Sequence, residues 1–196
     1  MKTFLTCVLG LSLVSLAGVA SAQNLLVNGG FDTGTFSGWT TNGGSATLKK
    51  TYGTNSPQYA VVFNVTTSPA TAVISQSFTT TVGKSYELSF YYGGYTTVGS
   101  PRPQTLGVEV TGTSLIFSNS VTPPSYSNPA VFENFTDTFT ATSTSTTLTF
   151  LDETVDTTKS DGVLDTVSVT AVPEPSTMAL SAAGGLFSLL ALRRRK

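Results

Sequence analysis

Between residues 24 and 170 the chain alternates apolar and polar positions in short runs, separated by Gly, Pro, Asn and Ser-Thr clusters. In the run 85–92, Tyr86, Leu88 and Phe90 share one face while Glu87 and Ser89 share the other, which is the two-residue period of a strand. No stretch of this region keeps a helical period over ten residues. Thr, Val, Phe and Tyr dominate the runs, as expected for strands. The pattern predicts strands at 24–28, 45–52, 58–64, 72–79, 85–92, 104–112, 114–118, 131–140, 146–151 and 163–170.

Many short strands with frequent turn signals predict an all-β fold, an antiparallel jelly-roll β-sandwich. Pro-, Ser- and Tyr-rich loops are expected at 96–103 and 122–129. The body, residues 23–171, is long enough for one domain and shows no internal repeat. We therefore expect a single sandwich with distinct segments at either end.

The first 22 residues have the organisation of a secretory signal peptide. Lys2 precedes an apolar run, and the small residues Ala20 and Ala22 occupy the two positions that signal peptidase reads. Cleavage is predicted after Ala22, so that Cys7 is removed. The alternative is a buried N-terminal helix, which the small-residue cleavage site does not favour.

The last 25 residues predict a short membrane anchor. Pro173, Glu174 and Pro175 precede an uncharged apolar stretch, 176–192, and a basic cluster that includes Arg193, Arg194 and Arg195. As a helix the stretch would rise about 25 Å, at the short limit for a bilayer core of about 30 Å. The basic cluster should stay in the cytoplasm. A helix docked on the domain is the alternative, but the stretch has no polar face.

This tail, residues 172–196, resembles the PEP-CTERM sorting signal, with motif, helix and Arg cluster in order. The resemblance implies a Gram-negative bacterium that makes exopolysaccharide. It also implies an exosortase-type protease that recognises Pro173-Glu174-Pro175 and removes the helix. The protein would be anchored transiently in the inner membrane and then reach the cell surface or the exterior.

Charge and composition exclude several functions. Five basic and eleven acidic residues lie between Lys2 and Arg193, a net charge of −6 (five minus eleven). Nucleic acid binding is disfavoured because phosphate contacts need a basic surface. The sequence has no His, and its one Cys lies in the signal peptide. Catalytic triads, disulfides and thiolate zinc sites are therefore excluded, and a bound metal would need oxygen ligands, which favours calcium.

A second resemblance covers most of the body. Residues 24–34 with 36–39 resemble the opening of galactose-binding-like jelly rolls, a group that includes carbohydrate-binding modules. Residues 59–62, 74–78, 86–90 and 164–169 are similar to later strands of that group, in the same order. The resemblance implies a sandwich that binds carbohydrate.

The same resemblance implies a structural calcium ion that ties the first strand to the last. Its ligands would be Asp32, Asp165 and the carbonyl of Gly30. The chain departs from the family where a Glu is usual at Asp32 and a second acid is usual at Thr166. Two solvated loop acids are the alternative. The acidic stretch 152–161 lacks the spacing of a calcium loop and is expected to be a solvated hairpin.

Aromatic residues provide candidate sugar contacts, because a ring face packs against the C–H groups of a sugar. Tyr91, Tyr92 and Tyr95 lie beside a Gly-Gly bend, and Tyr126 lies in the second Pro-rich loop. Ordinary packing is the alternative for all four. Trp39 is expected in the core, since Trp is buried in most proteins.

Catalysis is not expected. Glycoside hydrolysis needs two carboxylates facing one substrate, whereas Glu87, Glu109 and Glu133 look like isolated strand residues. The sequence thus favours an exported surface or matrix protein that binds exopolysaccharide without being an enzyme. The alternatives are a purely structural or adhesive biofilm-matrix component with no specific ligand, and a carboxylate-based polysaccharide hydrolase.

Overall fold

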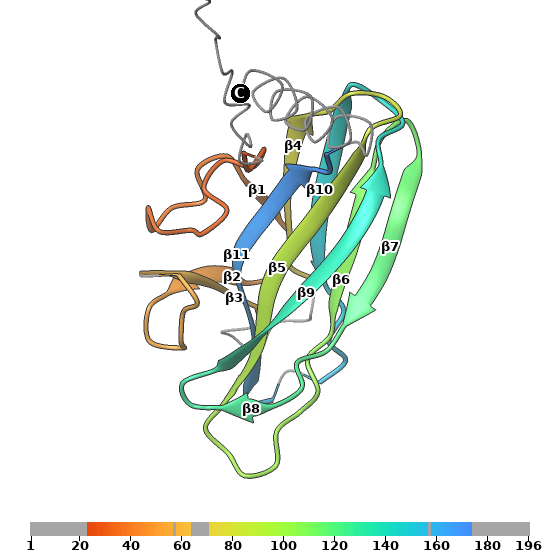
Figure 1. Cartoon of the computed structure of the whole chain (residues 1–196). Helices are drawn as coiled ribbons and strands as arrows, with labels where there is room; N and C mark the ends of the chain where they lie inside the picture. The colour runs from red at the N-terminus through yellow and green to blue at the C-terminus, as the bar shows by residue number, and fades with distance from the viewer. Residues whose placement is uncertain (1–22, 57, 64–70, 157, 174–196) are drawn as a thin grey trace, which may run out of the picture. The chain divides into compact units, whose positions relative to one another are not determined.

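The computed structural model describes residues 23–56, 58–63, 71–156 and 158–173, and in this part the chain forms eleven strands and no helix (Figure 1). The strands are β1 Thr40–Asn42, β2 Ala46–Lys49, β3 Ala60–Phe63, β4 Val73–Thr79, β5 Ser85–Thr96, β6 Leu106–Thr111, β7 Leu115–Val121, β8 Tyr126–Ser127, β9 Val131–Thr140, β10 Ser145–Asp152 and β11 Ser160–Ala171. The predicted all-β sandwich is confirmed.

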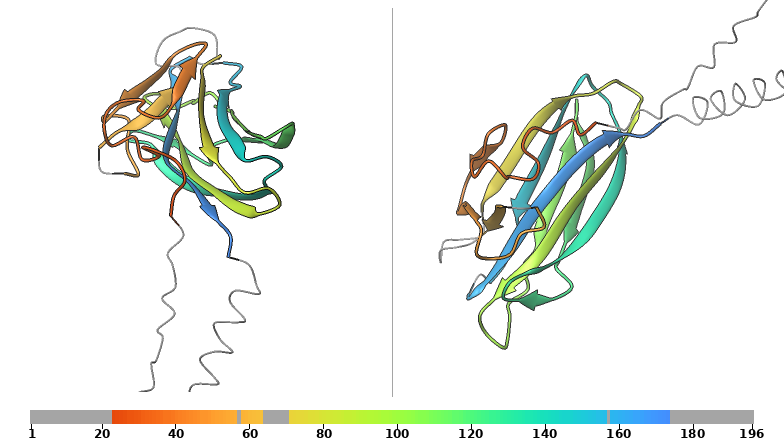
Figure 2. Two further views of the ribbon diagram at one scale, coloured as in Figure 1. Left: turned by 90° about the horizontal axis from the view of Figure 1, so that it is seen from above. Right: turned by 60° about the vertical axis from the view of Figure 1, so that its left-hand side comes forward.

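The strands form two layers, which Figure 2 shows from two further directions. Sheet A has the order β1-β4-β10-β6-β7. Sheet B has the order β2-β3-β11-β5, and both β8 and β9 pair with the far side of β5. Neighbours run antiparallel except for the short β5–β8 pair, which is parallel. The long strands β5 and β11 lie at the centre of sheet B.

The core lies between the sheets because alternate residues of each strand face inward. Leu88 and Phe90 of β5 and Leu148 and Phe150 of β10 are almost fully buried there. The rings of Phe90 and Phe150 meet edge to face, 5.2 Å between centroids, and so join the two sheets. Burying each such side chain contributes about 1.5–3 kcal/mol, which is the main stabilisation available to a chain without disulfides.

The segment 24–28 was predicted to be a strand and is not one. Asn28 takes a left-handed conformation, φ 53°, which interrupts an extended ladder. The segment is nevertheless joined to both sheets: Leu25 donates its N–H to the carbonyl of Val169 on β11, and the Gln76 side chain of β4 both accepts from and donates to the backbone of Val27.

Strand β5 continues through Gly93 and Gly94, where a bend was predicted. At Gly93 a Cβ would lie 2.7 Å from the Val131 carbonyl oxygen, and at Gly94 it would overlap the Tyr126 ring. The two glycines therefore allow β8 and β9 to approach the end of β5 closely.

A smaller apolar cluster lies on the outer face of sheet B. It contains Ala60, Val62, Ala130 and Val163, with Tyr52, Tyr95 and Phe132 packed against it. This cluster and the main core both fall within Ala22–Val172, which is a compact unit that holds both sheets.

The predicted signal peptide, with Ala20 and Ala22, lies outside the described residues, as do Glu174, Pro175 and the predicted helix with its Arg cluster. Pro173 is described, and it is exposed just after β11. In the described residues no helix is long and apolar enough to cross a membrane.

Candidate functional site

The outer face of sheet B carries the candidate site. The strand register places Val62, Val163, Gly93 and Phe132 in one row across β3, β11, β5 and β9. Gly93 leaves the middle of this row without a side chain. Because Val62, Val163 and Gly93 are small and apolar, aromatic side chains can pack on this part of the sheet.

Tyr52 and Tyr95 form the most prominent feature of this face. Tyr95 lies opposite Asp161 on β11, and Tyr52 comes from the loop after β2. The ring centroids are 4.0 Å apart and the planes are inclined by 39°. The Tyr52 carbonyl accepts the N–H of Ala130 at 2.8 Å, so the loop is attached to the segment that leads into β9. Together with Phe132 these rings are called the aromatic patch below, and all three are half-buried.

Asp161 places a carboxyl group beside the aromatic patch. Burial, together with the negative charge of Asp152, raises the pKa of Asp161 to about 7. Burial and the Asp161 charge in turn raise the pKa of the Tyr52 hydroxyl. Near neutral pH the Asp161 carboxyl is therefore protonated in part of the population, and its neutral form can donate a hydrogen bond.

The same face becomes polar away from the patch. Tyr91 lies between Asp165 and Asn134 in the register. The Ser89 hydroxyl donates to Asn134 Oδ1 at 2.9 Å. The two following rows hold hydroxyl and carboxylate side chains, namely Ser168, Ser89 and Thr136, then Thr170, Glu87 and Thr138. The face thus offers rings at one end and hydrogen-bonding groups at the other.

Of the four tyrosines proposed from the sequence, the structure brings Tyr91 and Tyr95 to this face and separates the other two from it. Tyr92 is 1% exposed, its hydroxyl lies against Gly162, and burial raises its pKa well above the usual range. Tyr126 lies against Gly94 on the inner side, and its hydroxyl accepts the N–H of Gln104 at 2.5 Å. Tyr92 is therefore not placed for sugar stacking, whereas Tyr126 is half-buried, and its contact with a sugar stays a prediction.

Three members of the site were missed from the sequence: Tyr52, Phe132 and Asp161. Phe132 and Phe135 are three residues apart and so lie on opposite faces of a strand. Since Phe135 points inward, this spacing could have placed Phe132 on the outer face. Tyr52 gave no such signal, because a loop rather than a strand positions it. Trp39 was assigned correctly to the core, where it is 7% exposed and its Nε1–H donates to the Asn28 carbonyl.

Asp165 lies at the junction of β11, the opening segment and the loop before β3. Its Oδ2 accepts the N–H groups of Asn55 and Ser56, both at 2.7 Å, and its Oδ1 accepts the N–H of Thr166 at 2.6 Å. The Ser56 hydroxyl lies 2.8 Å from the Gly30 carbonyl oxygen and 3.0–3.1 Å from both carboxylate oxygens. Burial raises the pKa of Asp165, and these hydrogen bonds oppose the rise.

In this structure N–H donors bond to both Asp165 oxygens. Calcium needs six to eight oxygen ligands at about 2.3–2.6 Å, and a carboxylate oxygen that accepts one N–H keeps a further lone pair for a cation. Asp32 is exposed and accepts the N–H of Gln58 at 3.2 Å. In the described part of the chain no group of three or more Asp or Glu side chains gathers that could hold a metal ion. Calcium binding by Gly30, Asp32 and Asp165 stays a prediction, for which a binding measurement is the test.

The three glutamates weighed for catalysis lie on different parts of the sandwich. Glu87 lies on the outer face of sheet B, Glu109 on the outer face of sheet A, and Glu133 opposite Tyr92 at the edge strand β9. The acidic stretch 152–161 differs from the solvated hairpin that was expected. Asp152 and Asp161 at its ends are buried, while Asp156 forms an exposed ion pair with Arg102 at 3.1 Å.

A β-sandwich with a half-buried aromatic patch beside hydrogen-bonding side chains has the features of a carbohydrate-binding module. A family model described as a carbohydrate binding domain, CBM_4_9, matches residues 23–159, and the chain belongs to this family. A second model, the PEP-CTERM protein-sorting motif, matches residues 171–196. Both resemblances noted from the sequence are confirmed, and together they indicate an exported carbohydrate-binding protein.

Solved structures show the same fold. The chain is similar to TmCBM61 in complex with β-1,4-galactotriose, with 19% identity and a TM-score of 0.59 over 77% of this chain and all of that one. It is also similar to the CBM22-1 xylan-binding domain of Paenibacillus barcinonensis Xyn10C, with 19% identity and a TM-score of 0.54 over 79% and 97% of the two chains. A family 16 carbohydrate-binding module gives 14% identity and a TM-score of 0.52 over 75% and 99%. No curated protein matches the sequence.

Proposed function

We propose that the chain binds a polysaccharide through the outer face of sheet B, without catalysis, at the surface of a Gram-negative cell. The producer's own exopolysaccharide is the proposed ligand, and a biofilm matrix is the proposed setting. The family supports binding rather than catalysis.

The observation that carries this proposal is the aromatic patch. Tyr52, Tyr95 and Phe132 expose part of each ring on one side of the sheet, where a sugar ring can pack its C–H groups. Core packing alone does not require this cluster, because the main core lies on the opposite side of sheet B.

The polar end of the face supports a ligand longer than one sugar. Tyr91 and Asn134 follow the patch along β5 and β9, and hydroxyl side chains continue beyond them. A row advances two residues, about 6.8 Å along an antiparallel strand, so several rows match an extended chain rather than a single ring. The negative charge of the body favours a neutral or weakly basic polysaccharide over an anionic one.

A glycan array with the compact unit 22–172 tests the proposal, followed by affinity gels with the polysaccharides that bind. We expect retention by at least one neutral polysaccharide. Absence of binding to every glycan would favour the structural alternative, a matrix component with no specific ligand. Release of reducing ends from a bound polysaccharide would contradict the non-catalytic assignment.

The sorting motif supports the proposed route. Signal peptidase would remove residues 1–22, and an exosortase-type protease would recognise Pro173-Glu174-Pro175. Replacing these three residues by alanine in the full chain should leave uncleaved protein in the inner membrane, detected by fractionation and immunoblotting. The unaltered chain is the control, and normal release of the variant would contradict the route.

A further inference from the structure

A pocket opens between the two sheets, on a side of the sandwich away from the outer face of sheet B. It lies where β7, an edge of sheet A, faces β9, an edge of sheet B. Its volume is about 80 Å³, several times the roughly 10–15 Å³ that one water molecule needs. The pocket can therefore hold more than a single water.

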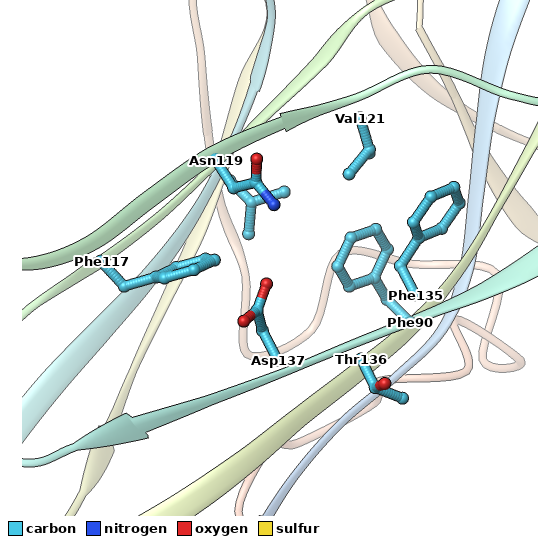
Figure 3. A pocket seen from close by; sticks show the side chains of 8 residues that line it. Phe90, Phe117, Asn119, Val121, Phe135, Thr136 and Asp137 are labelled. Atoms are coloured by element: carbon cyan, nitrogen blue, oxygen red, sulfur yellow. The ribbon is translucent and has the colours of Figure 1, made fainter.

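Apolar side chains form the floor and walls of this pocket. Phe90 of β5, Val108 of β6 and Phe135 of β9 come from the core, while Phe117 and Val121 line the β7 side (Figure 3). The rings of Phe90 and Phe135 are stacked, with centroids 5.5 Å apart. The floor thus consists largely of ring surface.

Two polar side chains face each other across the opening. Asn119 is paired with Val108, and Asp137 is paired with Leu88, so each occupies an inward position of its strand. Figure 3 shows the amide of Asn119 and the carboxylate of Asp137 pointing toward one another over the pocket. Asn119 Oδ1 accepts the N–H of Ser120 at 2.9 Å, which leaves the amide NH₂ group as a donor toward the pocket.

These polar residues interrupt an otherwise apolar pattern. The inward positions of β7 read Phe117, Asn119 and Val121, and those of β9 read Phe135, Asp137 and Phe139. Inward polar side chains on edge strands also protect a sheet against edge-to-edge pairing, so the pattern alone does not assign a site. The pocket beside Asn119 and Asp137 adds the second observation, because it gives their polar groups a space that a ligand can enter.

We propose that this pocket takes up one edge of a neutral sugar ring, such as the end or a branch unit of a polysaccharide, while the rest of the ring lies outside the 80 Å³ that the pocket encloses. The Phe side chains would pack against the C–H groups of the ring. The Asn119 NH₂ group would donate to one hydroxyl and the Asp137 carboxylate would accept from another, so the pair uses both hydrogen-bonding properties of a sugar hydroxyl. The carboxylate of Asp137 disfavours anionic sugars. This site is separate from the aromatic patch and does not depend on it.

The test uses unit 22–172 and the methyl glycosides of glucose, galactose, mannose and xylose as probes, with saturation-transfer NMR and titration of ¹H–¹⁵N spectra. We expect at least one glycoside to shift the amide signals of β7 and β9. Asp137→Ala and Asn119→Ala should weaken this binding about tenfold or more, as for a lost hydrogen bond to a charged or desolvated group. Ser118→Ala, on β7 but on the opposite face of that strand, should bind like the wild type.

A second pair of variants separates a ligand site from a structural feature. Asn119→Val and Asp137→Leu should raise the melting temperature while they abolish glycoside binding. The proposal would be overturned if no glycoside bound, if Asp137→Asn and Asn119→Ala both bound like the wild type, or if the apolar variants still bound. Loss of binding in Tyr95→Ala, with Asp137→Ala unaffected, would instead assign the glycoside to the aromatic patch and reject this pocket.

Discussion

The ring of Tyr52 lies on the ring of Tyr95, with 4.0 Å between centroids, although 43 residues separate them in sequence. Tyr95 belongs to the central strand β5, whereas Tyr52 belongs to the loop between β2 and β3, where its carbonyl accepts the N–H of Ala130. The patch therefore depends on the conformation of that loop as well as on the sheet.

Gly53→Ala should disturb this contact. Gly53 has φ +105°, and a Cβ there would lie 3.0 Å from the backbone N and O of Ala130. We expect the substitution to lower the free energy of unfolding by about 1–3 kcal/mol. Polysaccharide binding should also weaken, because Tyr52 would move away from Tyr95. Thermal denaturation and affinity gels measure the two effects.

Gly99→Ala provides the control, because an added Cβ at that position meets no atom within 4 Å and the backbone is not left-handed. It should keep both stability and binding. An equal loss in both variants would show that the Tyr52 loop has no special role.

The hydrogen bonds of Asp165 predict that this residue stabilises the junction between β11 and the loop before β3. Ser56→Ala should cost about 0.5–1.5 kcal/mol, the usual net contribution of one hydrogen bond. Asp165→Ala should cost more, since the N–H groups of Asn55 and Ser56 would lose their acceptor. Asp32→Asn is the matched control and should be nearly neutral, because Asp32 is exposed.

Melting curves with calcium and with a chelator complete this test. A lower melting temperature with the chelator is expected if calcium binds Gly30, Asp32 and Asp165. An unchanged melting temperature would contradict the calcium site and leave the junction to the hydrogen bonds of Asp165 alone.

The sequence was sufficient to place the long strands, because their alternation continues over several residues. It also contained a signal against Tyr92: this residue falls on the same face of the strand as Tyr86, Leu88 and Phe90, the apolar face of the pattern. Tyr91 and Tyr95 have the opposite parity and reach the outer face.

The rest of the site could not be obtained from local pattern. Tyr52 is positioned by Ala130, and Asp161 acquires its raised pKa from burial and from Asp152, so both depend on contacts between distant segments. Asn119 and Asp137 could be assigned inward only once the register with β6 and β5 was known. Contacts between distant segments and the register between strands cannot be inferred from the sequence of one strand.

Stability should decrease as the pH rises toward neutrality. The pKa of Asp161 is about 7 in the folded protein, against about 3.9 for an unfolded Asp. Between these values the folded state binds the extra proton, so the contribution of this group is greatest below about pH 4 and is lost as the pH rises through 7. A shift of about three units corresponds to at most about 4 kcal/mol. The raised pKa of Asp165 also makes the folded state less stable as the pH rises. The lowered pKa of the exposed Asp156 has the opposite effect on stability.

Thermal denaturation of the wild type and of Asp161→Asn measures this effect. The melting temperature of the wild type should be higher near pH 5 than near pH 8, and the variant should depend less on pH. Equal pH dependence in the two proteins would contradict the role assigned to Asp161.

The most direct test of polysaccharide binding by the aromatic patch is calorimetric titration of Tyr95→Ala, Tyr95→Phe and Tyr59→Ala with a polysaccharide that the wild type binds. We expect Tyr95→Ala to lose affinity about five- to tenfold, as for one lost aromatic contact. Tyr95→Phe keeps the ring and should bind almost as the wild type does, and so should Tyr59→Ala, whose ring packs against Gly34 and Lys50 away from the patch. Unchanged affinity of Tyr95→Ala in a protein of wild-type stability would contradict the assignment.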